Sequence, residues 1–139
     1  MPNIKYVGKN LFIEKLSIAN IAKKHGTPFY LYSENQIKEN YIKFFDTFKK
    51  IKPLVCFAAK SNSNLSILRS LGKLGAGIDV VSGGELLKAL KAGIKGNKIV
   101  FSGVGKSEEE LKIAINKKIL LINCESESEA KIINKIAKR

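Results

Sequence analysis

Four apolar segments recur at even intervals along the chain, and each is followed by a stretch whose apolar residues have helical spacing. The segments read LVCFAA (54–59), GIDVVS (77–82), KIVFSG (98–103) and KILLINC (118–124). LVCFAA lacks polar alternation, which predicts a strand buried on both faces. Repeated strand–helix units of this kind predict an α/β fold with a parallel sheet.

The segment before these units follows a different pattern. SIANIAKKHG (17–26) predicts a short helix with Ser17 as its N-cap and Gly26 at its end, and TPFYLY (27–32) predicts a strand. SENQ (33–36) is a capping box that opens a second helix. We therefore expect an entry segment over 1–32 and about four βα units over 33–139.

Two parallel architectures have this pattern, an open doubly wound sheet and the first half of a TIM (β/α)8 barrel. Functional residues of a barrel lie where several strands end. Lys60, Asp79 with Ser82, and Ser102 with Gly103 all occupy such positions. The half-barrel is therefore the expected fold.

Composition restricts the functional class. The net charge is +13, from 25 Lys+Arg against 12 Asp+Glu, but Arg69 and Arg139 are the only arginines and the lysines are scattered. This pattern argues against a nucleic-acid surface. Cys56 and Cys124 have no metal or disulfide spacing, and with His25 as the single histidine no metal site is expected. The absence of a signal-like or membrane-spanning run predicts a cytoplasmic protein.

Lys60 directly follows the first buried segment, where an ammonium is costly to desolvate. If the strand alternation continues, Lys60 shares a face with Cys56 and Ala58, whereas Phe57 and Ala59 point to the other side. With the bulkier set against the helices, Lys60 would point into the barrel mouth. A partly desolvated lysine is a good Schiff-base nucleophile, although a lysine that simply reaches solvent explains the same position.

Five motifs in this order resemble one enzyme family. They are HGTPFYLYSENQIKENY, FAAKSNSNLSIL, LGAGIDVVSGGELLKALKAG, IVFSGVGKSEEEL and INCESESEA. Together they resemble the N-terminal part of the diaminopimelate decarboxylases, which belong to the fold-type III pyridoxal-phosphate decarboxylases with the ornithine and arginine decarboxylases. The resemblance extends from about residue 5 to the end of the sequence.

The resemblance implies roles for three residues. Lys60 matches the lysine that binds pyridoxal 5'-phosphate as a Schiff base, with Ser61 in place of the alanine usual in the family. Asp79 matches the acidic residue close to that lysine, and Glu85 matches a second acidic position behind the cofactor pocket. Local alternatives remain: Asp79 can cap a turn, and Ser82 with Glu85 forms a capping box.

Two further charged segments have simpler interpretations. Lys106, in the loop FSGVGKSEEEL, is expected to be a solvated loop lysine that does not face an anionic ligand. The acidic segment ESESEA (125–130) is explained by the N-terminus of a helix, which favours negative charge, and not by a metal site.

By resemblance, the reaction is the decarboxylation of meso-2,6-diaminopimelate to L-lysine, with a small amino acid as substrate. The resemblance also implies a further C-terminal β-domain that is absent here, so the chain is expected to need a homodimer partner or a missing C-terminal half. Alternatives are a related ornithine, arginine or carboxynorspermidine decarboxylase, a non-catalytic pyridoxal-phosphate-binding protein, and an inert remnant.

Overall fold

The computed structural model describes residues 3–138, which form two compact units divided after Thr47. By this division helix α2 (Glu34–Phe48) belongs to the first unit except for its last residue. The domain boundary expected at residue 32 lies before this helix and stays a prediction. Each unit is described by itself below.

The first unit begins with a small antiparallel sheet that the sequence analysis did not foresee. Its strands are β1 (Ile4–Val7), β2 (Asn10–Ile13) and β3 (Leu16–Ser17), in that order. Helix α1 (Ile18–His25) follows, and the Ser17 side chain accepts a hydrogen bond from the Asn20 N–H at 3.4 Å. Gly26 ends the helix with φ 79°, so both expected boundaries of α1 are confirmed.

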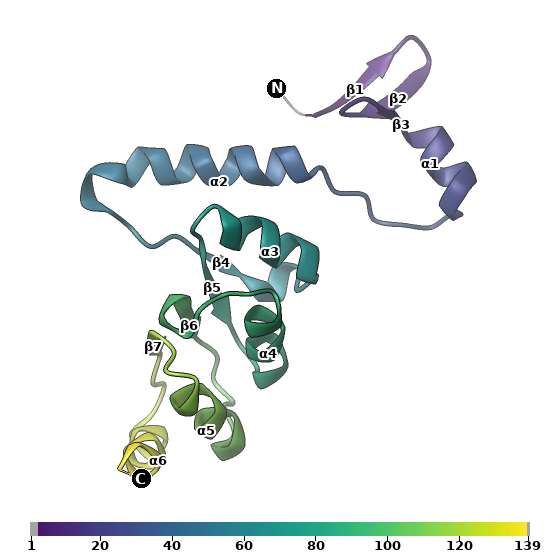
Figure 1. The fold of residues 1–139 in the computed structure, drawn as a ribbon. Coiled ribbons are helices and arrows are strands. Elements are labelled where there is room, and N and C mark those ends of the chain that lie inside the picture. Colours follow the sequence, from purple (N-terminus) through teal and green to yellow (C-terminus); the bar gives the residue numbers. More distant parts are fainter. Residues whose placement is uncertain (1–2, 139) are drawn as a thin grey trace. The chain divides into compact units, whose positions relative to one another are not determined.

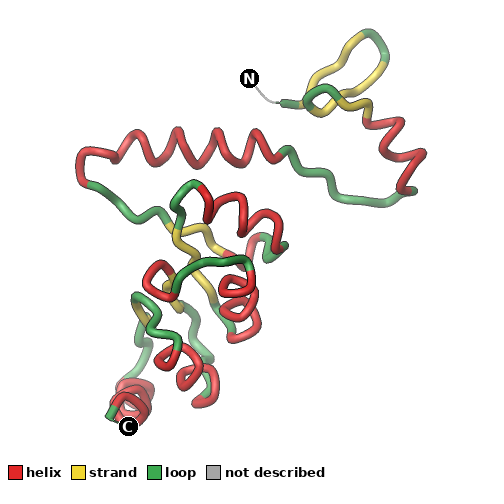
Figure 2. Tube along the Cα trace, viewed as in Figure 1, coloured by secondary structure: helices red, strands yellow, loops and turns green. Residues whose placement is uncertain are grey.

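The strand expected over 27–32 is wrong. The structure has a loop there, which Figure 2 draws in green between α1 and α2. Aromatic residues favour extended backbone, but a strand also needs a hydrogen-bonded neighbour, and within residues 3–138 this segment has none. The capping box of α2 is half formed: Ser33 Oγ accepts from the Gln36 N–H at 3.0 Å, whereas the Gln36 side chain accepts from the Asn3 N–H.

The second unit is the expected parallel α/β fold, with four strands in chain order and a helix after each (Figure 1). The strands are β4 (Cys56–Ala58), β5 (Gly77–Val80), β6 (Ile99–Phe101) and β7 (Leu121–Ile122). The helices are α3 (Leu65–Lys73), α4 (Gly83–Lys91), α5 (Glu108–Asn116) and α6 (Glu127–Ala137). Short 3₁₀ turns lie at Lys49–Ile51, Ala59–Ser61 and Gly96–Lys98.

The helices cover one face of this sheet. Ile78, Val80, Ile99 and Phe101 are fully buried on that face. Each such side chain contributes about 1.5–3 kcal/mol relative to exposure. Phe57 packs against the same core, as expected for the bulkier set of β4.

The opposite face of the sheet is only partly covered by the described residues. Cys56, Ala58, Asp79 and Val100 alternate with the buried set and are all half-buried. The expectation that the first strand is buried on both faces is therefore wrong within this unit, whose own residues cover this side only partly. β4 and β7 also pair along one edge each within that part of the chain.

Candidate active site

Lys60 lies just beyond β4, in the 3₁₀ turn Ala59–Ser61, and it is exposed. The turn is closed by the Ser61 hydroxyl, which donates to the Ala58 carbonyl at 2.8 Å. The chain leaves the extended conformation at Ala59, so the strand geometry does not extend to Lys60. Ala59 is nevertheless fully buried in the same helix-side core as Phe57, as expected. Lys60 stands at the carboxyl end of the strand, and the face to which it points stays a prediction.

Asp79 lies on the neighbouring strand β5, in register with Ala58 of β4. Its flanking residues Ile78 and Val80 are buried against the helices, so the Asp79 side chain lies on the open face. Lys60 follows Ala58 by two residues and therefore stands at the same end of the sheet. Among the described interactions no hydrogen bond or ion pair joins the Lys60 amine to the Asp79 carboxylate.

The carboxylate of Asp79 accepts a hydrogen bond from a residue of the next strand. The Ser102 hydroxyl donates to Asp79 Oδ1 at 2.6 Å, and the Asn123 side-chain amide donates to Ser102 Oγ at 2.9 Å. Ser102 and Asn123 directly follow β6 and β7. A line of polar groups thus crosses the ends of three adjacent strands. Ser82, grouped with Asp79 in the sequence, instead accepts from the Glu85 N–H as the N-cap of α4.

Asn123 is the residue at this end of the sheet that sequence reasoning missed. The signal was available, because Asn123 and Ser102 occupy the same position, one residue past an apolar strand. The acidic residues that follow Asn123 indicate a helix start and mask this signal. The sequence predicts Ser102 as a strand-end residue but indicates no partner for it.

Glu85 is engaged locally. Its Oε2 accepts a hydrogen bond from the Val81 N–H at 2.9 Å, and its own N–H donates to Ser82 Oγ at 3.3 Å. The capping interaction is therefore formed by the serine, while the glutamate reaches one residue further back than a capping box requires. The described interactions do not join Glu85 to Asp79, and its place behind a cofactor stays a prediction.

The charge of Asp79 affects the Cys56 thiol on the open face. Cys56 is in register with Gly77, which lies on the same strand as Asp79. Burial raises the pKa of the Cys56 thiol, and the negative charge of Asp79 raises it further. The thiol is therefore kept in its neutral form beside the carboxylate. It adds an uncharged, half-buried group to the floor of the site.

Lys106 is a correction to the sequence analysis, because its side chain is fully buried and not solvated. Its Nζ forms an ion pair with Glu129 Oε1 at 3.0 Å and also donates to the Gly103 carbonyl. The partner comes from α6, beyond the next strand, which local sequence could not indicate. The acidic segment 125–130 does open a helix, as expected, and Ser126 is its N-cap.

Glu110 makes a second interaction that joins neighbouring βα units. Its Oε1 accepts from the Gly83 N–H at 2.6 Å, and its Oε2 accepts from the Ser107 N–H at 2.9 Å, which completes a capping box at the start of α5. The hydrogen bond from Gly83, followed by that from Ser107, lowers the pKa of the Glu110 carboxyl. The starts of α4 and α5 are thereby joined at the end of the sheet that holds Asp79.

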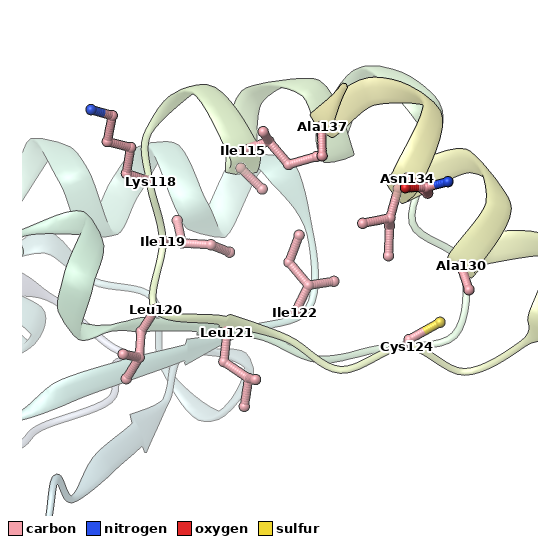
Figure 3. Close-up of a pocket in the computed structure, with 12 residues that line it drawn as sticks. Ile115, Lys118, Ile119, Leu120, Leu121, Ile122, Cys124, Ala130, Asn134 and Ala137 are labelled. Atoms are coloured by element: carbon pink, nitrogen blue, oxygen red, sulfur yellow. The ribbon is translucent and has the colours of Figure 1, made fainter. Parts of the chain in front are cut away.

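A separate groove of about 620 Å³ runs between β7 and helices α5 and α6 (Figure 3). Its lining is mostly aliphatic and includes Ile115, Ile119, Ile122 and Ala137. Figure 3 shows Ile119 and Ile122 between the strand and the two helices. None of the polar groups at the strand ends lines this groove, so it is not the candidate site.

Two absences concern the described residues alone. Within residues 3–138 no group of His, Cys, Asp and Glu side chains is placed to hold a metal ion. No helix in the same part of the chain is long and apolar enough to cross a membrane.

Comparison with known proteins identifies the family. Residues 34–139 match the pyridoxal-dependent decarboxylases, in their pyridoxal binding domain. The chain belongs to this family. A diaminopimelate decarboxylase of Aquifex aeolicus is 46% identical over 98% of this chain and 32% of its own length. One from Helicobacter pylori is 54% identical over 80% of this chain and 27% of its own length.

Solved structures of the pyridoxal-dependent decarboxylases have the same fold. A diaminopimelate decarboxylase from M. jannaschii, in complex with L-lysine, matches with a TM-score of 0.94 at 40% identity, over 98% of this chain and 33% of that one. This match confirms the expected parallel α/β fold as the N-terminal part of such an enzyme. The chain spans about a third of the length of the relatives it matches.

Proposed function

We propose that Lys60 binds pyridoxal 5'-phosphate covalently and that the whole protein decarboxylates meso-2,6-diaminopimelate to L-lysine. The observation that carries the proposal is the placement of the Lys60 amine and the Asp79 carboxylate at the ends of adjacent parallel strands. This placement occurs in a chain that belongs to the pyridoxal-dependent decarboxylases.

The groups at the strand ends fit the aldehyde end of the cofactor. Lys60 offers an exposed primary amine, which is the nucleophile that an aldehyde requires. The residue of β4 in register with Asp79 is Ala58, which has a small side chain. A small side chain at this point leaves room beside Asp79 for a flat ring. When bound, pyridoxal phosphate accepts the electron pair released as carbon dioxide leaves.

The residues of this chain would contribute binding and charge. Lys60 would hold the cofactor at the mouth of the sheet. Asp79, on the adjacent strand, would favour a protonated nitrogen at Lys60, because a nearby carboxylate stabilises a cation. Glu85 is proposed at the rear of the pocket, where its carboxylate already fixes the loop after β5 through Val81.

Diaminopimelate is favoured over other substrates by the comparisons. Relatives of that name are 43–54% identical to this chain, whereas a lysine decarboxylase structure is 26% identical. The domain division at residue 32, a cytoplasmic location, and completion by a C-terminal half or a homodimer partner belong to the same proposal. The unpaired edges of β4 and β7 support such completion, because an open sheet edge in a barrel is closed by further strands.

The test is reduction with borohydride after incubation with pyridoxal phosphate, followed by peptide mapping. Label on the peptide that carries Lys60 is expected, and Lys60→Ala should abolish it. Lys91→Ala is the matched control, since Lys91 is an exposed lysine on α4 and its loss should leave the labelling unchanged. Equal labelling of the Lys60→Ala variant would refute the cofactor assignment.

The substrate is tested on the whole protein, with the segment that completes the barrel. Carbon dioxide release from meso-2,6-diaminopimelate should exceed release from ornithine or arginine. A preference for ornithine or arginine would show that the protein is a related decarboxylase with a different substrate. Cofactor labelling at Lys60 without carbon dioxide release from any of the three would favour a non-catalytic cofactor-binding protein.

A further inference from the structure

We propose that Ser102 and Asn123 are positioning residues that hold the Asp79 carboxylate toward the cofactor nitrogen at Lys60. This inference rests on the proposed function, because it assigns a purpose to the carboxylate in that site. Neither residue is placed to bind the cofactor in the proposal above. Their role would be exerted through Asp79 alone.

The direction of the hydrogen bonds follows from the chemistry of the three groups. An ionised carboxylate only accepts, and a serine hydroxyl has a single proton to donate. With that proton on Asp79 Oδ1, the second partner of Ser102 Oγ must be a donor. Asn123 therefore presents its NH₂ and not its carbonyl, which fixes the orientation of its amide. The relay runs in one direction, from Asn123 through Ser102 to Asp79.

The backbone holds both residues in place. The Ser102 N–H donates to the Val80 carbonyl at 2.8 Å, and the Asn123 N–H donates to the Phe101 carbonyl at 2.9 Å. These bonds extend the sheet by one residue beyond β6 and β7. Side chains carried on such a fixed backbone have restricted directions, so the relay is pre-organised.

The relay reaches Asp79 from the side away from Lys60. In the strand order β4-β5-β6-β7, Lys60 follows β4 on one side of Asp79 and Ser102 follows β6 on the other. Ser102 occupies Oδ1, and Oδ2 accepts no hydrogen bond from residues 3–138. Oδ2 is therefore the oxygen available to a cation on the β4 side. The hydrogen bond to Oδ1 restricts the rotation of the carboxylate and favours this orientation.

The experiment measures the pH at which the absorbance of the bound cofactor changes, which reports proton loss from its link to Lys60. A nearby carboxylate favours the protonated form, so Asp79→Asn should lower this midpoint by about one pH unit. Ser102→Val removes the hydroxyl and should lower the midpoint in the same direction, by about half a unit. Ser102→Thr introduces a side chain of the same shape as valine but keeps the hydroxyl, so the midpoint of this variant should match that of the wild type.

A second variant and a double variant separate positioning from a structural role. Asn123 is exposed, so Asn123→Leu tests the outer donor without disturbing the core, and it should lower the midpoint less than Ser102→Val. In an Asp79→Asn background, Ser102→Val should cause no further shift, because the group it positions is gone.

The outcomes distinguish this inference from the proposed function. A wild-type protein with no cofactor on Lys60 refutes both. Cofactor on Lys60 with the same midpoint for the valine and threonine variants refutes the relay and leaves the proposed function intact. An equal shift from Ser102→Val with and without Asp79 also refutes the relay.

Discussion

Removing Lys106 should destabilise the protein far more than removing any exposed lysine. The Lys106 side chain is fully buried, and its partner Glu129 retains 10% of its side-chain exposure. Lys106→Met keeps the aliphatic volume but leaves the Glu129 carboxylate without its cation and the Gly103 carbonyl without its donor. Breaking a buried pair in this way costs about 3–5 kcal/mol. Because Glu129 keeps the hydrogen bond from the Glu125 N–H, we expect the lower end, about 3 kcal/mol.

The assay is urea unfolding followed by circular dichroism, with Lys131→Met as the control. Lys131 lies on the same helix as Glu129 and pairs with Glu127, but their side chains are 74% and 83% exposed. An exposed pair of this kind contributes about 0.3–0.5 kcal/mol. If Lys106→Met lowers the free energy of unfolding no more than Lys131→Met does, the argument from burial is wrong.

The pH dependence gives an independent check on the same pair. Burial alone would raise the pKa of Glu129, but the hydrogen bond from Glu125, with the hydrogen bond and charge of Lys106, holds it below its ordinary value of 4.5. A carboxyl whose folded pKa is lowered stabilises the fold above the unfolded pKa, and this contribution is lost as pH falls through the folded value. Part of that lowering depends on Lys106, so the stability difference between wild type and Lys106→Met should narrow below pH 4.5. A difference that is constant with pH would contradict this explanation.

Three further substitutions test the surroundings of the site. Asp79→Asn should lower the pKa of the Cys56 thiol, because the carboxylate charge that raises it is removed; the rate of thiol alkylation against pH, mapped to the Cys56 peptide, measures this, and an unchanged profile would contradict it. Gly83→Ala should destabilise the protein by about 1 kcal/mol, since a Cβ at Gly83 would lie 2.8 Å from Glu110 Cγ and displace that carboxylate from the Gly83 N–H. In Gly84→Ala the added Cβ meets nothing closer than 3.9 Å, so this change should stabilise helix α4 by up to about 1 kcal/mol. Thermal unfolding of the two glycine variants measures the difference. Equal changes in stability for Gly83→Ala and Gly84→Ala would refute the reasoning.

The parallel part of the fold could be predicted because its signals are local and repeated. Each of β4 to β7 lies in one of the four recurring segments, and Ser82 before α4 makes the expected cap. The antiparallel strands β1 to β3 could not, because they are two to four residues long and β1 is exposed throughout. Strands without a buried face leave no alternation to detect.

The strand-end positions of the candidate site residues could be predicted, but their contacts could not. The strand-end location of Lys60 and Asp79 follows from the βα repeat, which places all carboxyl ends at one edge of the sheet. The conformation of Lys60 does not follow, because the 3₁₀ turn begins before the lysine. The partners of Asp79 and Lys106 lie 23 residues further along the chain, on other strands and helices, and only tertiary structure brings them together.

The side-chain interactions that join neighbouring βα units lie at the same end of the sheet as the proposed cofactor site. Glu110 joins the start of α5 to Gly83 at the start of α4, and Lys106 joins the loop after β6 to Glu129 on α6. The loop that leads to Gly83 follows β5, which carries Asp79. The loop that contains Lys106 follows β6 and begins with Ser102. A change in either interaction should therefore shift the midpoint of the bound cofactor as well as the stability. The same loss of stability from a change in the helix-side core, such as Leu86→Ala on α4, should leave that midpoint in place, because the fully buried Leu86 packs on the opposite face. Measuring both quantities for both classes of variant separates a site that depends on its loops from one that depends only on a folded sheet.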